Sequence, residues 1–78
     1  MNYEDETYID NIAIDVFSIA MKNKMRKKRL EGRGGWYDPT AISNEELSTM
    51  LKDHMEKGDP VDIANFCMML FARGEKIK

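Results

Sequence analysis

The sequence predicts an all-α protein with one long N-terminal helix, a glycine-rich loop and a helical hairpin. Residues 6–31 contain no proline or glycine, and apolar residues recur in them at helical spacing. Further along, Gly58 and Pro60 separate two shorter segments that also follow helical periodicity. A chain of 78 residues has room for one domain, so residues 1–78 are expected to fold as a single unit.

The first helix is expected over residues 6–31, within an N-terminal segment 1–31. Five acids and no base give residues 1–21 a charge of −5, whereas seven bases and one acid give residues 22–33 a charge of +6. Acids near the start and bases near the end both suit the helix dipole. Gly32 is the expected C-terminal stop.

The two shorter helices are expected over residues 44–57 and 60–73, after a Gly/Trp loop at 32–43. Ser43-Asn44-Glu45-Glu46 has the pattern of a capping box. In the dipeptide Asp59-Pro60, aspartate can cap the third helix, and proline suits its first position because the missing N–H is not needed there. The two helices therefore form a tight hairpin, and no strand is required.

The long helix is apolar over most of its circumference, so it needs cover on both sides. Two short helices cannot cover both faces of a helix roughly 39 Å long. The surplus is expected to meet another copy of the chain in a helix-mediated homo-oligomer; a monomer with extra surface apolar residues is the alternative. One face comprises Ile9, Ile12, Ala13, Val16, Ile19, Ala20 and Leu30, and the expected oligomer interface comprises Ile14, Phe17, Met21, Met25, Met68 and Phe71.

A basic block followed by a glycine-aromatic loop is the candidate ligand site. Six bases in residues 22–29 attract anions. Consecutive glycines let backbone N–H groups converge on an anion, arginine binds phosphate through two hydrogen bonds, and an aromatic ring stacks on a base. The alternative is that Trp36 packs in the core while the bases solvate a helix end. The expected ligand-binding residues are Lys22, Arg26, Arg29, Arg33, Gly34, Gly35, Trp36 and Tyr37.

No catalytic residue, metal site or cofactor is expected. His54 has no visible catalytic partner and is expected to be packed or half-buried, and Cys67 is expected to be a small buried hydrophobe. Acids recur every three residues, but Gly58 interrupts the helix inside the series, so they do not share one face for Mg²⁺. These acids are Asp53, Glu56, Asp59 and Asp62.

The composition favours a cytoplasmic protein. One cysteine excludes an internal disulfide, no apolar run approaches the length of a membrane span, and the acidic start lacks the basic region of a signal peptide. Fourteen acids oppose the binding of a long polyanion. Neither a membrane nor a nucleic acid is therefore an expected partner.

Two stretches of the chain resemble a module found in small tailed-phage proteins. They are RGGW at residues 33–36 and KGDPVDIANFCMML at residues 57–70, with Arg73-Gly74 following. The resemblance covers about residues 26–75, and a similar module precedes some phage dATP/dGTP diphosphohydrolases. It implies a phage origin, the host bacterial cytoplasm and an all-helical fold. It does not imply hydrolysis, because such enzymes are expected to carry paired E-x-x-E and E-x-x-D motifs, and the E-x-x-D of Glu56 straddles a glycine.

Two classes of function follow from these features. The first is a non-enzymatic protein that binds a phosphorylated small molecule, such as a cyclic oligonucleotide or an ADP-ribose derivative. Such a protein would sequester a host immune signal, by analogy of type with phage anti-defence sponges and not by a shared motif. The second is a protein-interaction module that binds and inhibits or redirects a host or phage protein, since methionine and arginine are favoured in interfaces.

Overall fold

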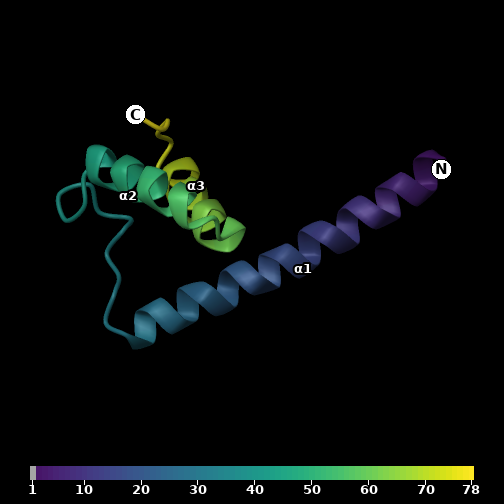
Figure 1. The fold of residues 1–78 in the computed structure, drawn as a ribbon, viewed down its shortest axis with the longest axis horizontal. Helices are drawn as coiled ribbons and strands as arrows, with labels where there is room; N and C mark the ends of the chain where they lie inside the picture. The colour runs from purple at the N-terminus through teal and green to yellow at the C-terminus, as the bar shows by residue number, and fades with distance from the viewer. Residues whose placement is uncertain (1) are drawn as a thin grey trace.

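The computed structural model describes residues 2–78, and in that range it contains three helices and no strand (Figure 1). The all-α prediction is therefore confirmed. Residue 1, which belongs to the expected segment 1–31, lies outside the described residues. The helices are α1 (Tyr3–Leu30), α2 (Asn44–Lys57) and α3 (Pro60–Ala72).

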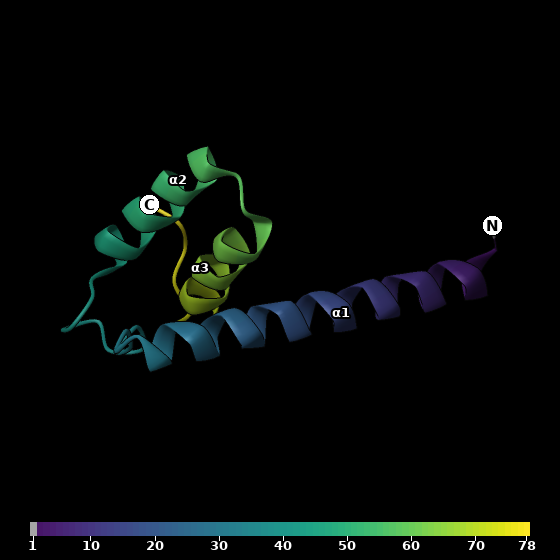
Figure 2. The same cartoon turned by 60° about the horizontal axis from the view of Figure 1, so that its bottom comes forward.

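The second and third helices form a hairpin, and α1 lies against α3 (Figure 2). The N-terminal half of α1 projects well past the hairpin in both views (Figures 1 and 2). Within residues 2–78, no helix has the length and apolar character needed to cross a membrane.

Local capping explains where α1 begins and ends. The Asn2 side chain accepts a hydrogen bond from the backbone N–H of Asp5 at 2.9 Å, so the helix begins three residues earlier than expected. At the other end Gly32 adopts a φ of 84°, which favours glycine. The N–H of Arg33 reaches the carbonyl of Lys28 at 2.9 Å, which makes this end a Schellman motif.

The predicted caps of the hairpin are present. Ser43 accepts from the N–H of Glu46 at 3.1 Å, and its hydroxyl lies 3.2 Å from the Glu46 carboxylate. Gly58 ends α2 at a φ of 81°. Asp59 then accepts from the N–H of Val61 at 2.9 Å, with Pro60 in the first turn of α3.

A small apolar core lies between α2 and α3. Its fully buried members are Leu47 and Leu51 of α2 and Leu70 of α3. The side chains of Ile42, Phe66 and Met69 pack around them and are partly buried. This core belongs to the hairpin and the end of the loop, since α1 contributes no buried residue.

Arg73 fastens the loop to the end of α3. Its side chain is 5% exposed, and its Nη1 donates to the carbonyls of Trp36 at 2.8 Å and Ile42 at 2.9 Å. The Nε atom lies 2.7 Å from Oε1 of Glu75. A planar guanidinium supplies several donors at once, so one side chain holds both sides of the turn between residues 36 and 42.

The hairpin covers a different face of α1 from the one expected. Met21 and Met25, which were assigned to the oligomer interface, are half-buried on the side of α1 that meets α3. The Nδ2 group of Asn65 donates to the carbonyl of Met21 at 3.3 Å. The face that carries Ile9, Ile12, Val16, Ile19 and Leu30 remains exposed.

The other expected interface residues lie in different environments. Ile14, Phe17 and Phe71 are exposed, and Met68 is partly buried. The expectation that Cys67 is buried is wrong, because the thiol is exposed. At about 100° per residue, Cys67 and Phe71 point roughly 60–100° beyond Leu70, on the side of α3 that turns away from α1 and the core.

Candidate ligand-binding site

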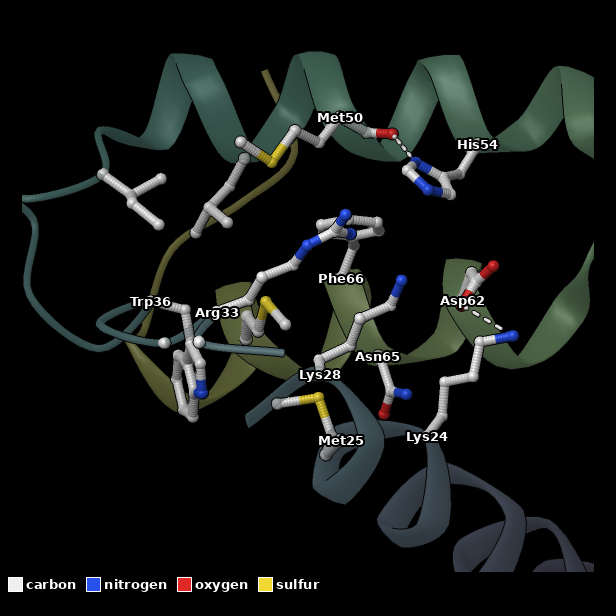
Figure 3. Close-up of a pocket in the computed structure, with 15 residues that line it drawn as sticks. Lys24, Met25, Lys28, Arg33, Trp36, Met50, His54, Asp62, Asn65 and Phe66 are labelled. Atoms are coloured by element: carbon white, nitrogen blue, oxygen red, sulfur yellow. Dashed lines mark hydrogen bonds and ion pairs between the residues drawn. The ribbon is translucent and has the colours of Figure 1, made fainter. Parts of the chain in front are cut away.

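A cavity of about 490 Å³ lies between the C-terminal half of α1, the glycine loop and the hairpin (Figure 3). Its volume falls within the range of small-molecule pockets. Its polar and apolar lining residues are contributed by all three helices. The residues used below are Lys24, Met25, Lys28, Arg33, Gly34, Trp36, Met50, His54, Asp62, Asn65, Phe66 and Met69.

The Schellman motif at the end of α1 brings two of the lining cations together. It ties the backbone N–H of Arg33 to the carbonyl of Lys28, so the chain reverses and both side chains are directed toward the space between α2 and α3 (Figure 3). Neither α1 nor the loop alone would place them side by side. Gly32 makes the reversal possible, since its φ of 84° is strained for other residues.

The two cations differ in how much of their charge is already compensated. Lys28 is half-buried and forms no ion pair within residues 2–78. Arg33 lies 4.0 Å from a carboxylate oxygen of Glu31, and its side chain is 68% exposed. Both retain N–H donors for an anionic group.

The third lining cation, Lys24, is bound to the hairpin. Its Nζ donates to Asp59 Oδ2 at 2.9 Å and lies 3.3 Å from Asp62 Oδ1. The hydrogen bond to Asp59, followed by that to Asp62, raises the pKa of Lys24 above its ordinary value. The same hydrogen bond, followed by that from the Val61 N–H, lowers the pKa of Asp59. Lys24 therefore fixes α1 to the start of α3 and closes one end of the cavity.

An aromatic pair forms one wall of the cavity. The rings of His54 and Phe66 have centroids 4.8 Å apart and are tilted by 51°. His54 Nδ1 lies 2.8 Å from the carbonyl of Met50, and because a carbonyl only accepts, Nδ1 carries the proton. The expectation that His54 is packed and half-buried is confirmed.

Asn65 supplies an unused acceptor beside the cavity. Its side chain is buried, and its Nδ2 donates to α1, but Oδ1 has no hydrogen-bond partner within the described residues. Buried polar atoms are nearly always hydrogen-bonded, so an orphaned acceptor requires an explanation. The accessible area of Oδ1 is below 1 Å², so a donor in the cavity would reach it only if the surrounding side chains moved.

The cavity contains part of the expected ligand set. Arg33, Gly34 and Trp36 line it, whereas Gly35 does not. Trp36 is half-buried, and its ring meets the edge of the Tyr37 ring at a centroid distance of 6.0 Å. Tyr37 itself is exposed and lies outside the lining.

The expected basic strip lies on another side of α1. Lys22, Arg26 and Arg29 are exposed and do not line the cavity. At about 100° per residue, they project roughly 140–200° from Lys24 around the helix axis. The hairpin approaches the side that carries Lys24 and Lys28 instead.

Lys24, Lys28 and the aromatic wall of His54 and Phe66 are not among the ligand-binding residues predicted from the sequence. A signal for the lysines was present, because they lie within about 60° of Met21 on the helical wheel. Whichever partner covers Met21 and Met25 must also meet these lysines. No comparable signal existed for the wall, which depends on how the hairpin closes.

The described residues contain no cluster of three or more histidine, cysteine or acidic side chains that would hold a metal ion. The lining supplies lysine and arginine donors and aromatic surface to the cavity. Comparison with known proteins found no matching family model, no matching curated protein and no matching solved structure.

Proposed function

We propose that the cavity binds a phosphorylated small molecule of the nucleotide type, without turning it over. The observation that carries this proposal is the position of Lys28 and Arg33, whose cationic groups enter a cavity of about 490 Å³ with an aromatic wall. A phosphate and a flat ring are the two groups that such a site recognises.

Charge supports the anionic half of this ligand. Among the lining residues, Lys24, Lys28 and Arg33 oppose the single carboxylate of Asp62. Lys24 is already paired with Asp59 and Asp62, so an incoming phosphate would be bound by Lys28 and Arg33. Arginine offers two parallel donors to a phosphate, and lysine adds a compact charge.

The rest of the lining supports a flat ring. Phe66 packs against His54, and Met25 and Met69 add apolar surface elsewhere in the lining. The unpartnered Oδ1 of Asn65 is an acceptor at the junction with α1. The ring of a base would pack on the apolar wall, whereas an exocyclic amino group would reach this atom only after the side chains around it moved.

Binding without chemistry suits sequestration. In the phage setting that the sequence resemblance implies, the ligand would be a host immune signal such as a cyclic oligonucleotide or an ADP-ribose derivative. The role in the host cytoplasm would be to lower the free concentration of that signal, and affinity for it would be sufficient.

Calorimetry against cyclic di- and trinucleotides, ADP-ribose derivatives and dNTPs tests this proposal. At least one should bind with the titrated molecule recovered intact, and Lys28→Glu should weaken binding about tenfold or more, because a repelling charge replaces a phosphate partner. Lys57→Glu is the matched control, since Lys57 is exposed at the end of α2 and outside the cavity. Silence across the panel, or equal losses in the two variants, would reject the cavity as the site.

The exposed apolar surface supports a second candidate function, protein–protein interaction. The N-terminal half of α1 and the side of α3 with Phe71 expose large apolar groups to solvent. Such surface fits either another copy of the chain or a host or phage protein. If a purified partner protein binds the intact chain but not the Arg26→Glu variant, and no nucleotide of the panel binds, this function is favoured over ligand binding.

A further inference from the structure

We propose that α1 pairs with α1 of a second copy as an antiparallel two-helix coiled coil. The contact would use the face of α1 that the hairpin leaves open. This inference concerns assembly and does not depend on ligand binding at the cavity.

The open face carries a heptad seam. Ile9, Ile12, Val16 and Ile19 alternate in steps of three and four, which is the spacing of coiled-coil core positions. All four are exposed although they are branched apolar residues. The same spacing continues through Asn23, Arg26 and Leu30, of which only Leu30 is apolar, so the continuous apolar part of the seam spans residues 9–19.

The hairpin does not obstruct the seam. It packs on the side of α1 that carries Met21, Lys24 and Lys28. At about 100° per residue, the middle of the seam lies roughly 150° away from the middle of that side. A second helix can therefore lie along α1 while the hairpin and the cavity stay where they are.

Charge selects a second copy in antiparallel orientation as the occupant. The N-terminal half of α1 is acidic and the C-terminal half is basic, so a reversed copy places opposite charges together. In the antiparallel pair, Val16 lies against Ile19 of the second copy. This register places Asp15 beside Lys22 of the second copy and Glu6 beside its Lys27, and the twofold symmetry repeats each pair.

A parallel pair would place like charges together. Positions flanking the seam would then bring Lys22 against Lys27 of the second copy, and the acidic halves would lie side by side. Asn23 would face its own counterpart, which is the one feature that suits a parallel pair. The repulsion between Lys22 and Lys27 and between the two acidic halves opposes that single contact.

Two substitutions on α1 test which face is used. Val16 and Ile14 are both 62% exposed, but Val16 lies in the seam and Ile14 does not. Sedimentation of the intact chain should show a dimer, and Val16→Asp should weaken it about a hundredfold or more, because a carboxylate enters the apolar contact. Ile14→Asp should leave the dimer intact. Trp36 fluorescence establishes that the loop and hairpin fold in each variant, because the helicity of α1 itself is expected to fall when the dimer dissociates.

A charge swap tests the orientation. Lys22→Glu should weaken the dimer about fivefold to tenfold, because it places a carboxylate beside Asp15 of the second copy. Adding Asp15→Lys should restore it. Tighter association of Lys22→Glu would indicate parallel helices and overturn the orientation. Two results would overturn the interface. One is a monomer of 9.1 kDa at all concentrations, and the other is a dimer that is lost in Ile14→Asp but kept in Val16→Asp. The seam would then be a contact for a different protein.

Discussion

The hairpin and the N-terminal half of α1 contain similar proportions of apolar residues but use them differently. In the hairpin, Leu47, Leu51 and Leu70 are removed from solvent by neighbours in the same chain. In residues 3–17 of α1, every side chain is exposed. The hairpin therefore gains its stability within the chain, whereas this half of α1 lacks such support.

This contrast shows which part of the molecule has no cover within its own chain. Isolated helices of about 15 residues are only marginally stable in water, and the acidic first turn and Asn2 cap contribute little more. Branched apolar side chains along an unsupported helix add no stability until something covers them. The proposed pairing along the seam would explain why α1 extends so far beyond the hairpin.

The largest expected effect separates two adjacent residues of α3. Leu70 is 2% exposed and Phe71 is 86% exposed. Leu70→Ala should lower the free energy of unfolding by about 3 kcal/mol, because it leaves a void in the core. Phe71→Ala should change it by less than about 0.5 kcal/mol. Urea unfolding followed by circular dichroism measures both.

Equal losses of unfolding free energy in Leu70→Ala and Phe71→Ala would contradict the structure, in which Leu70 is covered and Phe71 is open to solvent. A loss of association in Phe71→Ala, with stability unchanged, would show that this side of α3 takes part in an oligomer, as the sequence analysis expected. The two measurements therefore separate a role in the core from a role in assembly.

A smaller effect is expected at Arg73, which fastens the loop to the hairpin. Arg73→Met should lower the free energy of unfolding by about 2 kcal/mol, because the carbonyls of Trp36 and Ile42 lose a charged donor. The emission of Trp36 should also change as the loop loosens. Lys57→Met, at an exposed position, serves as control, and similar losses in the two variants would disprove the fastening role.

Helix boundaries were predictable because their causes are local. Ser43, Gly58 and Asp59 each cap a helix through contacts within a few residues. The predicted start of α1 at residue 6 is too late, because the cap at Asn2 precedes the acids of the first turn. Local chemistry therefore fixes where the helices start and stop.

Which faces are covered could not be predicted, because coverage depends on how the hairpin meets α1. Bases surround the C-terminal half of α1, so spacing alone could not distinguish Lys24 and Lys28 from the strip of Lys22, Arg26 and Arg29. The same limit applies to Cys67. Its apolar neighbours in the sequence lie on different sides of α3, so spacing alone could not show which side is covered. Arg33 and Trp36 were found because the glycine loop places them at the bend itself.

The smallest expected effect is at the ion pair that fixes α1 to the hairpin. The hydrogen bond from Lys24 lowers the pKa of Asp59 below its ordinary 3.8, so the pair stabilises the fold above that pH and is lost as pH falls through the lowered value. Lys24, whose pKa is raised above 10.5, keeps its contribution until pH rises beyond that range. α1 should therefore loosen from α3 in acid before the hairpin core unfolds.

Hydrogen exchange at pH 3 and pH 6 measures this loosening. At each pH, the protection of the α1 amides is compared with that of the α2 amides. Asp59→Asn is the decisive variant, since asparagine still caps α3 but cannot pair with Lys24. In this variant, the residues of α1 next to α3 should exchange faster at pH 6, and much of the acid-dependent difference should disappear. Unchanged protection of α1 in Asp59→Asn would mean that the ion pair of Lys24 with Asp62, together with Met21, Met25 and the hydrogen bond from Asn65, holds the helix in place, and that the pair with Asp59 adds nothing measurable.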